Sequence, residues 1–84
     1  MAVAYRSIAT KAYSGGAATC NKPTGTVSGD ELIAAIYSDG TPSITGPSGW
    51  TRQMTDTVGA GGDTWTFEVW TKLAGGSEPS SYTW

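Results

Sequence analysis

The sequence contains no histidine and only one cysteine, Cys20. Histidine is the commonest general base and metal ligand near neutral pH, so its absence removes the simplest routes to acid–base catalysis and to a metal centre. One thiol cannot form an internal disulfide or a zinc site. We expect Cys20 to be a small buried side chain, with a reactive or intermolecular thiol as the alternative. The chain also lacks a Gly-x-Ser-x-Gly elbow, and together these absences argue against an enzyme.

Charge is scarce as well. Charged residues make up 14% of the chain, against about 25% in ordinary globular domains. The five Lys and Arg residues are scattered and the net charge is −2, so no basic patch for nucleic acid is predicted. No stretch approaches the ~20 apolar residues of a membrane span, which argues against a membrane partner. The 84 residues allow one domain, spanning 1–84.

Gly, Ser and Thr are abundant, and good helix formers are few. Thr favours strands, whereas Gly and Ser favour turns. Four Trp and four Tyr indicate a chain that folds rather than a disordered one. Several short strands separated by turn signals predict an all-β fold, a small Greek-key β-sandwich, with a small open barrel as the alternative.

In the first half of the chain, residues 3–10 alternate weakly and predict a first strand, and 17–21 predict a short one. Residues 31–37 form the most apolar run, and a buried strand suits them better than a helix capped by Asp30. In that strand one face carries Leu32, Ala34 and Ile36, and the other carries Ile33, Ala35 and Tyr37. Residues 43–45 are expected to be a short extended piece within a loop.

In the second half, Pro47-Ser48-Gly49 predicts a tight turn with Pro at its second position. Residues 50–57 and 64–73, separated by a Gly-rich loop over 59–63, predict a hairpin, and 81–84 begin a last strand. For the strand over 64–73 we expect the apolar face to be the inner one. That face carries Trp65, Phe67, Val69 and Leu73, and the opposite face carries Thr64, Thr66, Glu68, Trp70 and Lys72.

The aromatic residues divide into core and surface. We expect Trp65, Phe67 and Trp50 in the core, and Tyr82 as a tyrosine corner whose hydroxyl bonds to backbone. Trp70 is expected on the exposed face, unless a bulge returns it to the core. An apolar outer face indicates a covering subunit or loop. The predicted interaction surface comprises Ile33, Tyr37, Trp70 and Trp84.

The acidic residues offer only weak alternatives to this interpretation. A glycosidase pair among the seven acids would need a cleft that so small a sandwich hardly provides. A calcium site would use Asp39, Asp56 or Asp63, but no metal site is expected. Asp30 is predicted to cap local backbone N–H groups in a turn.

Three motifs follow one another within residues 23–84. They are a Pro followed by Gly-Asp and an apolar strand (Pro23 to Ile36), a Pro-x-Gly-Trp turn (Pro47 to Thr51), and a strand, Gly-x-x-Glu-Pro loop and Tyr-containing strand (Val69 to Trp84). Together they resemble the immunoglobulin-like β-sandwich domains of phage virion proteins. The resemblance implies a place in the virion as a capsid decoration protein or a tail or fibre domain, without catalysis or cofactor. Such domains usually continue by one or two strands, so we expect either a fragment or a neighbour that completes the sheet.

The leading hypothesis is therefore a virion structural module that contacts other virion proteins as a homo-oligomer or within an assembly. The outer face and unpaired strand edges would make those contacts. The alternative is a carbohydrate-binding module for host glycans, in which Trp70 and Trp84 would stack on sugar rings.

Overall fold

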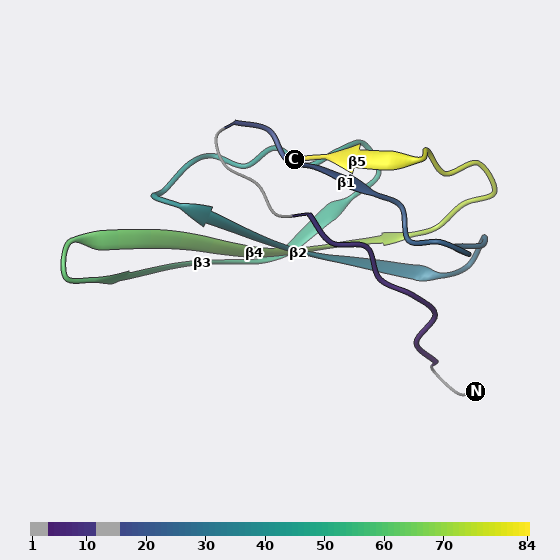
Figure 1. The fold of residues 1–84 in the computed structure, drawn as a ribbon, viewed down its shortest axis with the longest axis horizontal. Coiled ribbons are helices and arrows are strands. Elements are labelled where there is room, and N and C mark those ends of the chain that lie inside the picture. Colours follow the sequence, from purple (N-terminus) through teal and green to yellow (C-terminus); the bar gives the residue numbers. More distant parts are fainter. Residues whose placement is uncertain (1–3, 12–15) are drawn as a thin grey trace.

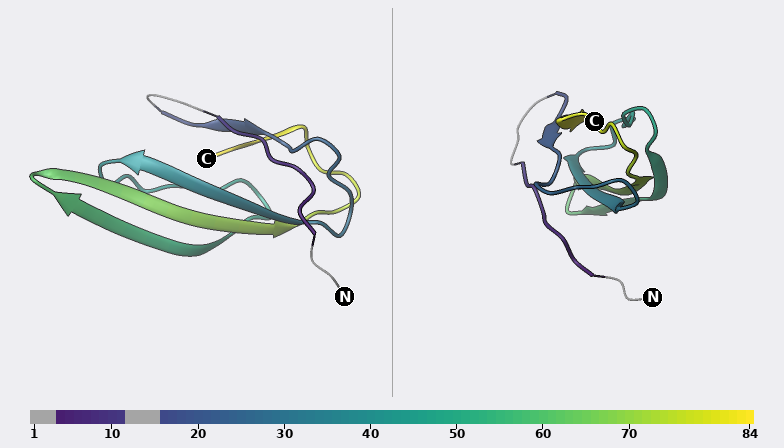
Figure 2. Two further views of the ribbon diagram at one scale, coloured as in Figure 1. Left: turned by 60° about the horizontal axis from the view of Figure 1, so that its bottom comes forward. Right: turned by 90° about the vertical axis from the view of Figure 1, so that its right-hand side faces the viewer.

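The computed structural model describes residues 4–11 and 16–84, which form five strands in two antiparallel sheets and no helix. The strands are β1 (Thr19–Asn21), β2 (Glu31–Asp39), β3 (Thr51–Ala60), β4 (Asp63–Leu73) and β5 (Ser81–Thr83). One sheet has the order β1-β5 and the other β2-β4-β3. They lie as two layers (Figures 1 and 2), which confirms the all-β expectation. Within the described ranges, no helix has the length and apolar character needed to cross a membrane.

The hairpin of β3 and β4 is the longest regular element, and it confirms the predicted pairing of these segments. Ala60 and Asp63 are paired, so the connecting loop consists of Gly61 and Gly62 alone, shorter than the loop expected over 59–63. Both glycines have positive φ, 62° and 90°. A two-residue turn with positive φ at both positions matches the twist of the flanking strands and favours Gly at each.

β2 confirms the strand predicted for the most apolar run, and no helix forms there. It pairs with β4 along its whole length, from Glu31 opposite Leu73 to Asp39 opposite Trp65. Its burial alternates as the two-residue period predicts: Leu32 is 6% exposed, and Ile33 is 71% exposed. The expected split of this strand into two faces is therefore correct.

The turn before β3 forms as predicted, but Pro47 occupies its first position rather than its second. The Trp50 amide donates a hydrogen bond to the Pro47 carbonyl at 3.2 Å, closing the turn over residues 47–50. Residues 43–45, expected to be extended, belong to the loop between β2 and β3 without strand pairing.

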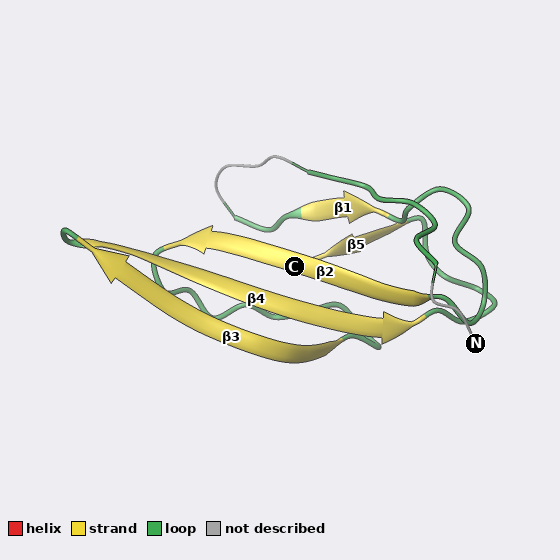
Figure 3. Cartoon of the chain, turned by 90° about the horizontal axis from the view of Figure 1, so that it is seen from below, coloured by secondary structure: helices red, strands yellow, loops and turns green. Residues whose placement is uncertain are grey.

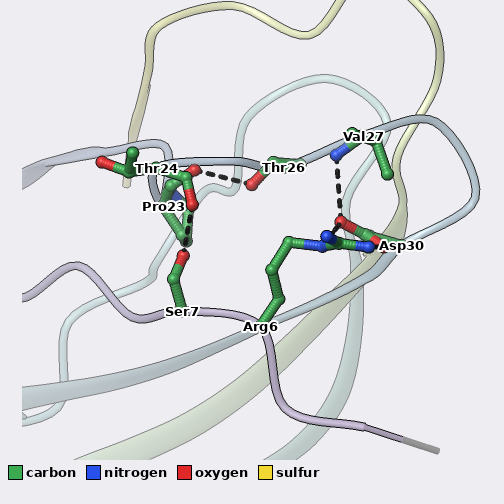
Figure 4. Close-up of polar contacts among 7 residues, drawn as sticks. All are labelled: Arg6, Ser7, Pro23, Thr24, Thr26, Val27 and Asp30. Carbon is green, nitrogen blue, oxygen red and sulfur yellow. Dashed lines mark hydrogen bonds and ion pairs between the residues drawn. The ribbon is translucent and has the colours of Figure 1, made fainter.

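Of the first strand predicted over residues 3–10, residues 4–10 form no strand, and residue 3 lies outside the described residues. Side chains tie this segment to its neighbours instead (Figure 4). The Arg6 guanidinium contacts the Asp30 carboxylate at 2.7 Å, and the Ser7 hydroxyl donates to the Thr24 carbonyl. Cys20 is half-buried beside this segment, with its thiol 3.6 Å from the Ala9 carbonyl.

The core lies between the two sheets at the end where β2 begins and β4 ends. Leu32, Ala74 and Tyr82 are buried there, with Trp50 and Trp84 packed against them. The Trp50 ring meets the rings of Tyr82 and Trp84 edge-on, each at 5.0 Å between centroids. The core position expected for Trp50 is confirmed.

The burial of β4 is the reverse of the expected one. Thr66, Glu68 and Trp70 are 4%, 2% and 8% exposed, whereas Phe67 and Leu73 are 36% and 66% exposed. The predicted division into two faces holds, but the more polar face points inward. The loop over residues 40–50 explains this result, because it covers that face: the Gly40 carbonyl accepts a hydrogen bond from Thr66, and Gly46 lies against the Trp70 ring.

Candidate functional site

One face of the three-stranded sheet, here called the outer face, is lined by apolar side chains that no other described segment covers. β1, β5 and the loop over 40–50 lie on the opposite side of the sheet, and the view from below shows the three strands unobstructed along most of their length (Figures 1 and 3). The register places nine apolar residues on this face. They are Ile33, Ala35 and Tyr37 of β2, Met54 and Val58 of β3, and Trp65, Phe67, Val69 and Leu73 of β4.

The outer face is continuous across the strands because paired residues share it. Tyr37 lies opposite Phe67, and Ala35 lies opposite Val69. On β3, Met54 pairs with the same Val69. Tyr37 is 65% exposed and Met54 is 42% exposed, so water reaches much of this apolar surface. Contiguous apolar patches of this kind mark interaction sites in soluble proteins.

The charged residues of the outer face are all acidic. Glu31 lies opposite Leu73 and Asp39 lies opposite Trp65, at the two ends of β2, and Asp56 lies opposite Phe67 on β3. The cations of the same three strands, Arg52 and Lys72, pair with residues of the inner face. A partner surface with an apolar centre and a basic rim would complement this arrangement.

The inner face of β4 holds a buried carboxylate that sequence reasoning placed on the surface. Glu68 accepts hydrogen bonds from the Trp70 indole N–H and the Thr55 hydroxyl, both at 2.9 Å, and lies 3.4 Å from the Arg52 guanidinium. Buried polar groups need such partners, and these bonds allow Glu68 to lie inside. The Glu68-x-Trp70 spacing puts both side chains on one face of a strand, a signal that could have indicated the pair.

A second carboxylate fixes the loop between β4 and β5. Glu78 accepts hydrogen bonds from the Lys72 ammonium at 2.7 Å, and from the Gly75 amide and the Tyr82 hydroxyl at 2.8 Å each. These bonds, the one from Lys72 foremost, lower the pKa of Glu78 to about 2. Burial of its ring and the bond to Glu78 raise the pKa of Tyr82. The predicted tyrosine corner thus has its ring in the core, but its hydroxyl bonds to a side chain rather than to backbone.

The four residues predicted to form one interaction surface do not lie together. Ile33 and Tyr37 share the outer face, at 71% and 65% exposed. Trp70, at 8% exposed, lies on the opposite face, and Trp84 is partly buried in the aromatic core, so their expected exposure is corrected. The bulge considered for Trp70 occurs in β3, between Arg52 and Met54, and leaves the orientation of Trp70 unchanged.

Sequence reasoning did not include several residues of the outer face in the interaction surface, because it assigned the alternating apolar residues of β4 to the core. Leu73 and Phe67 are the main examples. The alternation was the available signal, and only the choice of which face turns inward was wrong.

The carbohydrate-binding alternative placed a sugar ring on Trp70. A stacked sugar on Trp70 would require the loop over that ring to open.

The acidic residues do not assemble into a metal centre within the described residues, where no three potential ligands are grouped. Asp30 caps the turn before β2 as predicted, accepting a hydrogen bond from the Val27 amide at 3.0 Å. Hydrogen bonds from Arg6 and from that amide lower the pKa of Asp30.

An open cavity of about 2040 Å³ lies along β2. Its walls include residues 4–11, β2 over its full length, and the loop over 42–45. Trp50, Tyr82 and Trp84 close it at the aromatic core. The two sheets therefore leave unfilled space beside one edge strand.

No protein-family model, curated protein or solved structure matches this chain. The fold, the outer face and the open cavity along β2 are therefore the basis for a functional proposal.

Proposed function

We propose that this chain is a non-enzymatic module that binds another protein through the outer face of its three-stranded sheet. The observation that supports this proposal is the continuous apolar surface around Tyr37 and Phe67, which the fold leaves in water. An eleven-residue strand is about 36 Å long and three strands are about 10–14 Å wide. The face therefore presents roughly 350–500 Å², the size at which exposed apolar patches are often functional.

The chemistry of the outer face defines the partner. Tyr37 and Phe67 provide aromatic anchors, the residue type that contributes most to interface energies. The carboxylates of Glu31, Asp39 and Asp56 lie around them without a cation of the same strands on this face. The complementary surface is apolar at its centre and carries Lys or Arg at its rim, which also steers the two proteins together.

The resemblance of residues 23–84 to phage virion domains supports a subunit of a virion as this partner. Within that proposal the chain is an immunoglobulin-like module of a capsid decoration, tail or fibre protein. The two antiparallel sheets are compatible with such a module. Its work would be to hold neighbouring subunits together.

The test compares apolar-to-serine substitutions on the outer face with one elsewhere on the surface. Ile33→Ser combined with Tyr37→Ser removes exposed residues of the outer face, whereas Val27→Ser removes a 51%-exposed residue from a turn elsewhere. Each variant is titrated by surface plasmon resonance against purified capsid and tail subunits encoded beside this chain. We expect the double variant to lose at least tenfold in affinity, because truncating an aromatic anchor costs about 2 kcal/mol or more. Equal binding by the double variant and Val27→Ser would contradict the proposal.

A further inference from the structure

β2 is an edge strand that lacks the usual protection of an edge. It has nine residues without proline, lysine or a bulge, and its charges stand only at its ends. The other edges are different: β3 carries a bulge after Arg52, and β1 and β5 have three residues each. Short strands, bulges and lysines are the features by which proteins prevent unwanted pairing at sheet edges.

The free edge of β2 lies beside the open cavity. Strand order leaves β2 paired on one side only, and apart from the ladder to β4 its nine residues make no main-chain hydrogen bond to the described part of the chain. The cavity of about 2040 Å³ extends along the same nine residues. Leu32, Ile36, Ile44 and Trp50 give this cavity apolar walls. The unpaired backbone edge of β2 therefore lies beside a cavity with apolar walls.

We propose that this edge binds an extended segment of a different protein, which adds a strand to β2 and fills the cavity with its inward side chains. Main-chain hydrogen bonds to β2 would supply affinity, and alternate side chains would supply specificity. Nine residues span about 30 Å as a strand, the length of β2 itself. This inference depends on the edge and the cavity, and it does not require the outer face to bind anything.

The ends of β2 specify the charge of the partner. Glu31 and Asp39 are eight residues apart, so both lie on the outer face, and residues paired with them on an added strand would lie there too. Cross-strand pairs of opposite charge stabilise a sheet, and pairs of like charge destabilise it. The matching segment therefore has Lys or Arg at both ends and apolar residues at the alternate positions between them.

A second copy of this chain does not fit the edge. Antiparallel pairing of two β2 strands about Ala35 would place Glu31 of each copy opposite Asp39 of the other. Parallel pairing in register would place each acidic residue beside its own counterpart. Both arrangements oppose like charges at both ends of the strand, which disfavours self-pairing.

The test uses two nine-residue peptides and the whole chain. One peptide has lysine at both ends with valine and threonine alternating between them, valine being second, and the other has glutamate at both ends. Binding is followed by tryptophan fluorescence, since Trp50 and Trp84 line the cavity, and by hydrogen exchange of the β2 amides. We expect the lysine peptide to bind about tenfold more tightly and to protect β2 rather than β3.

A charge-swapped variant and a matched control test the site. Glu31→Lys with Asp39→Lys should reverse the preference, so that the glutamate peptide binds more tightly. Asp56→Lys with Asp63→Lys changes the net charge equally but lies outside the β2 edge, and it should keep the original preference. Reversal in both variants would show attraction by net charge alone and overturn the proposal. No binding of either peptide, or a dimer of the chain with protected β2 amides, would also overturn it.

Discussion

Protonation of Glu78 should weaken the fold strongly, because three hydrogen-bond donors hold this side chain as a carboxylate. The donors are the Lys72 ammonium, the Gly75 amide and the Tyr82 hydroxyl, and the Glu78 side chain is only 7% exposed. Its pKa falls from 4.5 to about 2 in the folded chain. The difference corresponds to roughly 1–3 kcal/mol of folding free energy, a large share of the stability of a domain this small.

The direction of the pH effect follows from the lowered pKa. A group whose pKa is lower in the folded state contributes its full stability above the pKa of the unfolded chain. That contribution is lost as pH falls through the folded value. The Glu78 contribution should therefore be complete above about pH 5 and disappear between pH 5 and 2.

Urea denaturation of the natural chain and of Glu78→Gln, from pH 7 to pH 2, isolates this contribution. The natural chain should be more stable by roughly 1–3 kcal/mol at pH 7, and the difference should shrink steadily below pH 5. Lys72→Met should move the loss to higher pH, because it removes the donor with the largest effect on the pKa of Glu78. A difference between the natural chain and Glu78→Gln that does not change with pH would refute this reasoning.

Three further substitutions test the inner face and the hairpin, each measured by urea denaturation at pH 7. Glu68→Ala should cost about 2–4 kcal/mol, because it leaves the buried Trp70 indole N–H without its acceptor; a loss under 0.5 kcal/mol would contradict the buried network. Gly46→Ala should cost about 1–3 kcal/mol, since its Cβ would overlap the Trp70 ring, whereas Gly76→Ala meets no atom within 4 Å and should be nearly neutral. Gly62→Ala should cost about 1 kcal/mol or more, because φ is 90° there; an unchanged stability would argue against the two-residue turn.

Local patterns in the sequence were sufficient to predict β2 and the hairpin of β3 and β4. Alternation over residues 31–37 located β2 and separated Ile33 and Tyr37 from Leu32. The Gly-rich segment before Asp63 located the hairpin. These signals are local, because strand period and turn chemistry depend on neighbours along the chain.

The inner face of β4 could not be predicted in the same way. The rule that apolar faces turn inward placed Phe67 in the core and Trp70 outside, and both assignments were wrong. The deciding contacts come from distant residues: Gly46 covers the Trp70 ring, and Thr55 and Arg52 satisfy Glu68. A buried polar face is stable only with such partners, and an alternating pattern does not reveal them.

The segment over residues 4–11 shows a similar limit of local patterns. Its weak alternation predicted a strand, yet side-chain contacts of Arg6 and Ser7 hold it without sheet pairing. A strand needs a partner edge, and residues 4–11 pair with none in the part of the chain that the structure describes. Alternation along the chain does not reveal whether such an edge is available.

The outer face as a protein-binding surface is the central claim, and hydroxyl-radical footprinting tests it most directly. Tyr37 and Tyr5 are 65% and 77% exposed in the free chain, so both should react with the radical. In the purified native assembly, Tyr37 should become protected, as should Met54 on the same face, while Tyr5 serves as the reference outside it. An assembly in which Tyr37 and Met54 react as fast as in the free chain would contradict the account.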